Sequence, residues 1–234
     1  LPEVADFFRN CHRDFRDDPV IHGFRHALDW IGDNARQGKP GRLLDVGPGT
    51  GIFLHLAREK GWQPFGIDVC PGSAEKAKTE FDIRVDVGDE TNVQDNSCIR
   101  VDVGDFETFG YQTASFDAVT MLDVLEHTVD PLGFLRRAFE VLKPGGVLYV
   151  AVPNQRCLMT VLLDRWIHAG LPGREFFLER LYVEPHVYYF CPQTLRTMLE
   201  KVGFESAGIR GGNVYLGRYR LPWTMRLPME IVLE

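Results

Sequence analysis

The sequence predicts an α/β fold with a doubly wound, mostly parallel sheet covered by helices on both faces. The first indication is the stretch 42–51, where the short apolar run of a strand buried on both faces meets three alternating glycines and then a helical pattern at 52–60. The second is that strand and helix patterns keep alternating as far as residue 152. The third is the region 153–192, whose many aromatics and length are more typical of a functional lid than of a plain connection.

Length and composition indicate one domain. The chain has 234 residues, of which 44% are hydrophobic, and this is enough for one sizeable core. We expect a single domain, 1–234, with four parts in chain order. They are an N-terminal helical cap (1–41), a ligand-binding core (42–152), a lid over the substrate (153–192) and a closing helix with strands (193–234).

Charge and cysteine content exclude several classes of protein. The formal net charge of −7 gives no overall basic field for nucleic acid or an anionic membrane. Five widely spaced cysteines without a C-x-x-C pair fit reduced thiols better than a disulfide framework or a zinc site. No apolar run approaches the roughly 18 residues that span a bilayer, and no signal-peptide pattern is seen. We therefore expect a cytoplasmic protein without nucleic-acid partners or membrane insertion.

Two helices are predicted before the first strand, and an acid is predicted at the end of the second strand. Residues 5–35 predict two amphipathic helices that meet near Asp18 and Pro19. The strand expected at 63–69 carries Asp68 at its carboxyl tip, followed by a short helix at 71–80. Asp68 lies 17 residues beyond Gly51, where a doubly wound fold places an acid against a ribose diol.

A duplicated heptapeptide complicates the third strand. Ile83–Asp89 reads Ile-Arg-Val-Asp-Val-Gly-Asp and recurs as Ile99–Asp105, 16 residues later. One short duplication is not a solenoid, which needs at least about three stacked repeats. Only one copy can form the third strand, and we favour the second because it lies at a natural distance before the next strand. Which acid, Asp89 or Asp105, then faces the ligand stays open.

The remaining pattern predicts seven strands in total. A fourth strand at 115–122, a helix at 131–142 and a fifth strand at 147–152 follow one another, with a turn at 143–146. A helix at 193–202 ends at Gly203, and the closing strands are expected at 204–210 and 214–219. No helix or strand is predicted for the tail, 221–234.

Two nucleotide-loop interpretations of residues 45–51 fail. A dinucleotide fingerprint needs Gly or Ala at position 52, where Ile52 stands, and a P-loop needs a Gly-Lys-Ser/Thr ending. The stretch Leu43–Gly51, Leu-Leu-Asp-Val-Gly-Pro-Gly-Thr-Gly, instead resembles motif I of the class I S-adenosylmethionine-dependent methyltransferases.

The resemblance covers residues 42–152 in the family's order. Four further stretches resemble its later motifs: Gly66–Val69, Val103–Phe106, Phe116–His127 and Leu142–Leu148. Pro185–Phe190 and Leu199–Phe204 are similar to the downstream region of the subgroup that includes ubiquinone-biosynthesis and sugar methyltransferases. The resemblance implies a Rossmann-like methyltransferase fold with a seven-stranded sheet, and S-adenosylmethionine as cofactor.

The resemblance also implies which residues bind the cofactor. Asp45 and the backbone of the glycines would bind the ammonium and carboxylate of the methionine end, Asp68 both ribose hydroxyls, and Asp105 with Phe106 the adenine. Leu122 would close the floor of the pocket. The complete cofactor-binding set is Asp45, Gly47, Gly49, Gly51, Asp68, Val69, Asp105, Phe106 and Leu122.

Two histidines are candidates for the catalytic base. Methyl transfer from a sulfonium is an in-line displacement that needs an aligned nucleophile and removal of its proton. His127 follows the fourth strand, and His186 lies in the aromatic region expected to cover the cleft. Each also has a structural interpretation, His127 as a brace of the following turn and His186 as a packing residue of the lid. A divalent metal at Asp123, Glu126 and His127 is an alternative that we do not adopt, because acids at a helix N-terminus explain the pattern.

The sequence therefore predicts methyl transfer to a small-molecule acceptor, with an oxygen nucleophile favoured. A nitrogen or carbon acceptor stays open, because the motifs concern the cofactor and not the nucleophile. The rival classes are a cofactor-binding regulatory module without catalysis and an NAD-dependent oxidoreductase, the latter weakened by Ile52.

Overall fold

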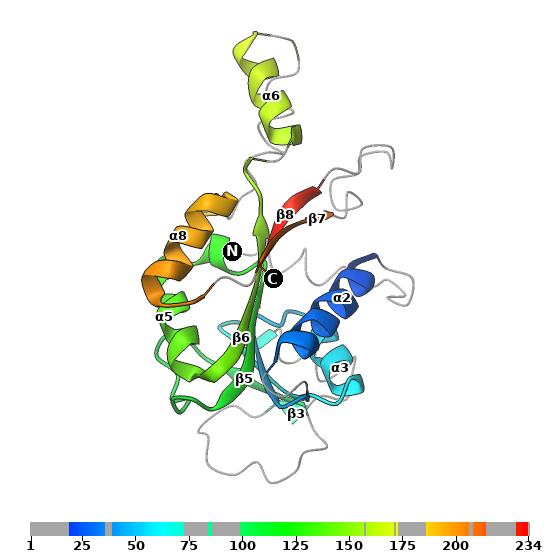
Figure 1. The fold of residues 1–234 in the computed structure, drawn as a ribbon, viewed down its shortest axis with the longest axis vertical. Coiled ribbons are helices and arrows are strands. Elements are labelled where there is room, and N and C mark those ends of the chain that lie inside the picture. The colour runs from blue at the N-terminus through cyan, green and yellow to red at the C-terminus, as the bar shows by residue number, and fades with distance from the viewer. Residues whose placement is uncertain are drawn as a thin grey trace.

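One mixed sheet forms the centre of the molecule, with helices on both of its faces (Figure 1). The structure is a computed structural model. It describes residues 19–35, 39–72, 84–85, 99–156, 158–170, 172, 186–205, 208–213 and 228–233.

The predicted alternation of strands and helices up to residue 152 is found only in part, because four strands follow one another between residues 63 and 122 without a complete helix among the described residues. The helices are α2 (Pro19–Asn34), α3 (Ile52–Glu59), the short 3₁₀ helix η3 (Leu125–His127), α5 (Pro131–Val141), α6 (Leu158–His168) and α8 (Pro192–Val202). The strands are β1 (Arg42–Val46), β2 (Gln63–Asp68), β3 (Arg84–Val85), β4 (Arg100–Val103), β5 (Phe116–Leu122), β6 (Leu142–Pro153), β7 (Ile209–Asn213) and β8 (Pro228–Leu233).

The sheet order is β3-β4-β2-β1-β5-β6-β8-β7. All pairings from β3 to β6 are parallel, and β8 pairs antiparallel with both β6 and β7. The mostly parallel, doubly wound α/β sheet is therefore confirmed. The expected number of strands was wrong, because the described residues form eight strands and not seven.

The additional strand comes from the duplicated heptapeptide. The second copy supplies β4, which pairs with β2 as expected for the third strand of the fold. The first copy supplies β3, and it pairs with β4 in register, Arg84 opposite Arg100 and Val85 opposite Val101. Arg84 and Val85 of the first copy thus lie beside the second copy at the edge of the sheet, while Asp89 falls outside the described residues.

Both faces of the central strands are buried, which explains their continuous apolar runs. Leu43 belongs to the core cluster that α2 and α3 cover, whereas its neighbour Leu44 belongs to the cluster under α5 and α8. In β5, Ala118 likewise belongs to the cluster that α2 and α3 cover, and Val119 belongs to the cluster under α5 and α8. Figure 1 shows the two helix pairs on opposite sides of the sheet. Each fully buried Leu or Val contributes about 1.5–3 kcal/mol relative to exposure, so the core holds β1 and β5 in place from both sides.

The predicted helices are largely confirmed. The helix after Pro19 and those at 52–60, 131–142 and 193–202 appear as α2, α3, α5 and α8, within one or two residues. Gly203 ends α8 with φ 111° as the C-cap, the left-handed conformation that glycine favours. The other N-terminal helix and most of the short helix at 71–80 lie outside the described residues.

The end of the sheet differs from the prediction. The strand expected at 204–210 begins at Ile209 as β7, and the strand expected at 214–219 lies outside the described residues. The tail instead contains β8, inserted between β6 and β7. Its partner β6 begins at Leu142, so the expected turn at 143–146 lies within a strand whose register shifts between Phe116 and Ala118 of β5. These strands depend on backbone partners far away in the chain, which a local pattern does not contain.

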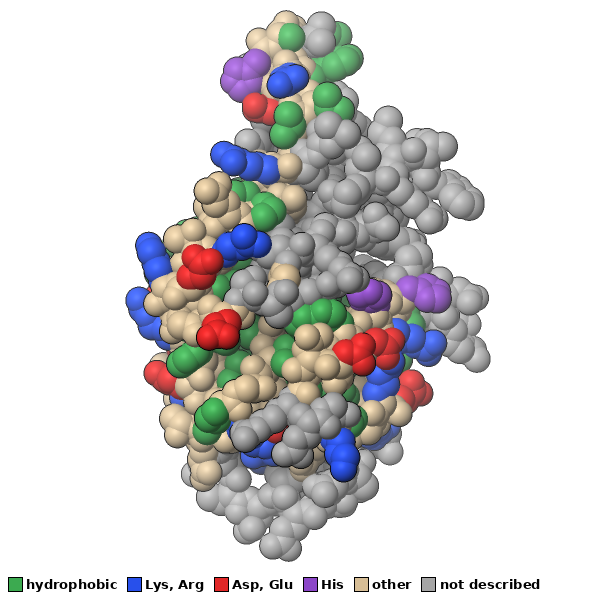
Figure 2. All heavy atoms as spheres, in the orientation of Figure 1, with side chains coloured by type: hydrophobic (Ala, Val, Ile, Leu, Met, Phe, Trp, Pro, Cys, Tyr) green, Lys and Arg blue, Asp and Glu red, His purple; other side chains and the backbone are tan. Residues whose placement is uncertain are grey.

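The region 153–192 contains α6, which stands out from the end of the sheet (Figure 1). Its surface carries exposed apolar side chains, among them Leu162 and Trp166, as the space-filling view of the same end shows (Figure 2). Within the described part of the chain, no helix combines the length and apolar character needed to cross a membrane.

Candidate active site

The predicted site residues gather at the carboxyl edge of the sheet. β1, β2, β4 and β5 are parallel neighbours, so the loops that follow them share this edge. Backbone hydrogen bonds join these loops beyond the strands: Gly47 N donates to Ile67 O at 2.8 Å, Gly104 N to Asp68 O at 2.9 Å and Asp123 N to Ala151 O at 3.0 Å. The edge is the place where an open parallel sheet binds its ligand.

The glycine loop adopts a backbone that other residues rarely adopt. Gly47, Gly49 and Gly51 have φ of 70°, 55° and 81°. A Cβ at Gly47 would lie 2.8 Å from Cγ2 of Val124, so the loop is also too close to the segment after β5 for a side chain. Gly51 is the N-cap of α3, whose first NH groups point out of the helix. The three glycines therefore allow a ligand to approach the loop backbone closely, and the predicted contact with the carboxylate of the cofactor's methionine end stays a prediction.

Asp45 is a buried acid at this edge. Its side chain lies opposite Thr120 in the β1–β5 pairing, and Thr120 Oγ1 donates to Asp45 Oδ1 at 2.6 Å. Burial raises the pKa of Asp45 to about 7, and the negative charge of Asp68 acts in the same direction. The hydrogen bond from Thr120 acts in the opposite direction and lowers this pKa. A cation beside Asp45 would offset this cost of ionisation, which fits an ammonium group.

Asp68 ends β2 beside the glycine loop. Its Oδ1 accepts from Cys70 N at 2.8 Å, a turn that fixes the orientation of the carboxylate. Beneath it, a Cβ at Gly66 would come within 3.0 Å of Leu54 Cδ1 and of Pro48 Cγ, so β2, the loop and α3 pack closely. Val69 is exposed. The predicted contact of Asp68 with a ribose stays a prediction.

The adenine turn is only partly as expected. Asp105 is exposed and its Oδ1 accepts from Glu107 N at 2.9 Å. Burial, with the charges of Asp105 and Asp130, raises the pKa of Glu107. Phe106 is buried in the core against Phe134, with ring centroids 5.6 Å apart. Its ring is therefore part of the core packing, and the predicted contact with adenine stays a prediction.

Leu122, the predicted floor of the pocket, is partly buried and packs against the core cluster under α2 and α3. It ends β5, and Asp123 follows it with φ 54°, an unusual conformation for a residue other than glycine.

A buried network supports the adenine turn, and the sequence analysis missed it. Asp102 in β4 is fully buried, and it accepts from Arg100 Nε at 2.6 Å and from the Tyr111 hydroxyl at 2.8 Å. Arg137 of α5 donates to the carbonyl oxygens of Phe109 and Tyr111 at 2.7 and 2.8 Å. The turn that carries Asp105 is thereby fixed to β4 and α5. The available signal was the alternation of Arg100 and Asp102 with two valines in a strand that the fold buries.

The two predicted histidines meet beyond β5. The rings of His127, in η3, and His186 are T-shaped with centroids 4.8 Å apart. Val187 N and Tyr188 N both donate to the carbonyl oxygen of Glu126, at 2.7 and 3.1 Å. These bonds hold the segment 186–190 against η3, so residues far apart in the sequence form one surface at the carboxyl edge.

The same pair belongs to a group that could hold a metal ion. Ligand atoms of Glu126, His127 and His186 lie within 4.8 Å of one another, and Glu126 is buried. Two imidazole nitrogens and one carboxylate oxygen are ligands that suit a divalent transition metal. The alternative weighed from the sequence used Asp123, and here the structure corrects it, because the third member of the group is His186.

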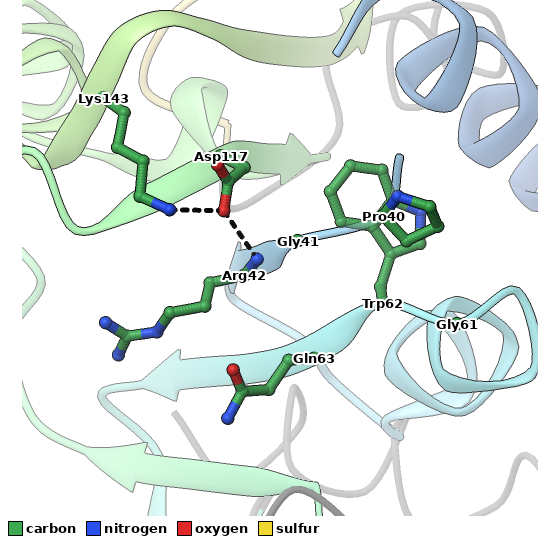
Figure 3. Close-up of a pocket in the computed structure, with 8 residues that line it drawn as sticks. All are labelled: Pro40, Gly41, Arg42, Gly61, Trp62, Gln63, Asp117 and Lys143. Atoms are coloured by element: carbon green, nitrogen blue, oxygen red, sulfur yellow. Dashed lines mark hydrogen bonds and ion pairs between the residues drawn. The ribbon is translucent and has the colours of Figure 1, made fainter. Parts of the chain in front are cut away.

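A hollow lies at the opposite edge of the sheet (Figure 3). Arg42, Gln63 and Asp117, near the amino ends of three strands, line it. Asp117 Oδ2 accepts from Lys143 Nζ at 2.7 Å and from the backbone N of Arg42 at 2.8 Å. This acid connects β1, β5 and β6 and lies opposite the edge of the glycine loop.

Comparison with known proteins identifies the family. A family model described as a methyltransferase domain matches residues 20–207. A ubiquinone biosynthesis O-methyltransferase of Xanthomonas campestris is 34% identical over 190 residues, which cover 79% of this chain and 70% of that protein. A similar enzyme of Bordetella pertussis is 28% identical over 189 residues, with the same coverage.

Solved structures share the fold. A possible histamine N-methyltransferase of Thermotoga maritima aligns with a TM-score of 0.61 at 16% identity, over 100% of this chain and 98% of that one. The family model matches well over half of the chain, and this match shows the family. The chain belongs to the class I S-adenosylmethionine-dependent methyltransferases and is an enzyme whose methyl donor is S-adenosylmethionine.

Proposed function

We propose that this enzyme methylates an oxygen atom of a small, largely apolar acceptor. The observation that carries the proposal is the contact between His127 and His186, with ring centroids 4.8 Å apart, just beyond the carboxyl end of β5. The relatives whose names specify O-methyl transfer support the choice of oxygen.

The cofactor contacts form the first part of the proposal. Asp45 accepts from the ammonium of the methionine end, and the backbone of Gly47, Gly49 and Gly51 faces its carboxylate. Asp68, joined by the neighbouring Val69, accepts from the ribose hydroxyls. Asp105 accepts from the adenine amino group, with Phe106 and Leu122 behind the pocket wall.

The chemistry forms the second part. The bound cofactor supplies a methyl group on a positively charged sulfur, so the protein must align the acceptor and take its proton. An imidazole is the side chain best suited to accept a hydroxyl proton near neutral pH. His127 is exposed and His186 is half-buried, so an acceptor can reach either ring from the surface.

The surroundings of the histidines indicate the acceptor class. Val129 and Val187 are 86% and 57% exposed, and the hydroxyl of the exposed Tyr188 donates to Val129 O at 3.1 Å. Apolar side chains this exposed next to a polar pair favour an acceptor with an apolar or aromatic body and one ionisable hydroxyl. The region 153–192, including α6, would cover it as a lid, and a cytoplasmic location stays part of the prediction.

Another candidate is a fold that keeps the cofactor site without this reaction. The [4+2]-cyclase SpnF aligns with a TM-score of 0.58 at 22% identity, over 87% of this chain and 64% of that one. This likeness concerns the fold alone, and a fold does not determine a reaction. Methyl transfer to a nitrogen or carbon atom is distinguished by the experiment described next.

The test uses isotopically labelled S-adenosylmethionine and acceptors that share one aromatic skeleton but carry a hydroxyl, an amine or an activated carbon. We expect label transfer to the hydroxyl compounds, and tight binding of S-adenosylhomocysteine by calorimetry. Transfer to the amines alone would contradict oxygen methylation. Cofactor binding without transfer to any acceptor class would favour the regulatory module.

A further inference from the structure

Thr120 and Asp45 form a buried polar pair between two central strands. They lie opposite each other in the β1–β5 register, with exposed fractions of 0% and 2%. Thr120 Oγ1 donates to Asp45 Oδ1 at 2.6 Å, within the range of a hydroxyl bound to an ionised carboxylate. The same oxygen lies 3.4 Å from Leu44 O, a much weaker contact. The single hydroxyl proton of Thr120 is therefore donated to Asp45 and not to Leu44 O.

The groups around Asp45 act in opposite directions on its charge. Burial raises the pKa of Asp45, and Asp68 at the end of β2 adds a raising effect through its negative charge. The first turn of α3 presents the buried apolar residues Ile52 and Phe53. The hydrogen bond from β5 acts the other way, because a donated hydroxyl proton stabilises the ionised carboxylate. Asp45 consequently titrates near neutral pH.

We propose that Thr120 is a positioning residue that keeps Asp45 ionised and oriented toward the cofactor's ammonium, which makes cofactor affinity depend on pH through this pair. A protonated Asp45 must release its proton to solvent when the ammonium binds. Thr120 itself need not touch the cofactor. The inference rests on the proposed cofactor contacts and is independent of the acceptor.

The pH dependence of cofactor binding tests this inference directly. Calorimetry would give the Kd of S-adenosylhomocysteine between pH 5.5 and 8.0. Because the folded-state pKa of Asp45 is raised to about 7, we expect wild-type affinity to fall about tenfold per pH unit below pH 7. Binding of 5′-methylthioadenosine, which has no ammonium, should lack this dependence.

Substitutions at Thr120 separate positioning from a general structural role. Thr120→Val and Thr120→Ala remove the donor, so the affinity profile should shift to higher pH, with a loss of about tenfold at pH 6.5 that shrinks toward pH 8. Thr120→Ser keeps the hydroxyl and should follow the wild type. Tyr111→Phe is the matched control, since it also removes a hydroxyl bound to a buried acid, Asp102; it should lower stability and leave the pH profile unchanged.

The role of Thr120, the cofactor contacts and the choice of acceptor are contradicted by different results. Equal weakening at every pH in Thr120→Val, or a flat wild-type profile, would overturn the inference even if the variants melt at a lower temperature. The wild-type comparison of the two ligands needs no variant, so it applies even if Thr120→Val does not fold. Failure of folded wild type to bind S-adenosylhomocysteine would overturn the cofactor contacts as well. A nitrogen acceptor would overturn only the proposed acceptor.

Discussion

The proposed cofactor side and the proposed acceptor side of this enzyme are built differently. On the cofactor side, the decisive features are buried or belong to the backbone: the positive φ of Gly47, Gly49 and Gly51, and the carboxylate of Asp45. On the acceptor side, they are side chains at or near the surface, His127 and His186, brought together from distant segments. The comparison teaches that cofactor affinity should depend on the core of the sheet, whereas turnover should depend on two surface segments.

The largest expected effect concerns the acceptor side. His127→Gln and His186→Gln remove the candidate bases, and loss of a general base lowers kcat by about 10²- to 10⁴-fold. The Kd of S-adenosylhomocysteine should stay within about twofold, because the cofactor contacts lie on other elements. His22→Gln, at an exposed histidine of α2, is the matched control. If both site variants retain wild-type turnover, base catalysis by these residues is wrong.

Removal of metal sharpens the same prediction. An imidazole base should act equally well after dialysis against a chelator. Loss of turnover on chelation, with recovery on adding a divalent ion, would instead assign Glu126, His127 and His186 to a metal. In that case Glu126→Gln should also lower metal affinity in a direct titration.

The next effect concerns the glycine loop. Gly47→Ala places a Cβ 2.8 Å from Val124 and forces an alanine to φ 70°, so we expect cofactor affinity to fall by tenfold or more, about 1.4 kcal/mol. Gly170→Ala is the matched control, because Gly170 has φ 69° but open space around it. Equal binding by the two variants, measured by calorimetry, would show that the close approach to Val124 is not needed.

Substitution of the ribose acid should have a somewhat narrower effect. Asp68→Asn keeps an oxygen for Cys70 N and removes the charge, and hydrogen bonds to charged groups contribute about 1.5–3 kcal/mol each. We expect the Kd of both S-adenosylhomocysteine and 5′-methylthioadenosine to rise about 10- to 100-fold, since both ligands contain the ribose. Glu59→Gln at the exposed end of α3 should change neither. Weakening of only one ligand would place Asp68 elsewhere in the pocket.

The smallest effect is expected at the edge of the sheet. Deletion of residues 84–99 joins Ile83 to Arg100 and regenerates one complete heptapeptide before Phe106. Because β4 pairs with β2 without help from β3, we expect folding to persist and cofactor affinity to change by less than about threefold. Thermal unfolding and calorimetry would measure this. An unfolded deletion variant would show that the duplicated strand is essential to the sheet.

The same comparison explains how far the sequence could be interpreted. The glycine loop, Asp68 and the strands around them follow from short-range spacing, because backbone conformation and burial impose those residue types locally. The placement of β8 and the partnership of Thr120 with Asp45 depend on strand pairing across long sequence distances. The exchange of Asp123 for His186 in the candidate metal group has the same cause, since only folding brings segment 186–190 to Glu126. The core position of Phe106 depends on α5, which supplies Phe134.

The duplicated sequence allows an outer strand, β3, to be compared with an inner strand, β4, at identical residues. Val85 and Val101 occupy the same position of an identical sequence, one in the outer strand and one between two neighbours. Any difference between their amide hydrogen-exchange rates therefore reports the environment of a strand and not its composition. The energetic consequence of a sheet edge can thus be measured at Val85 and Val101 with the local sequence held constant.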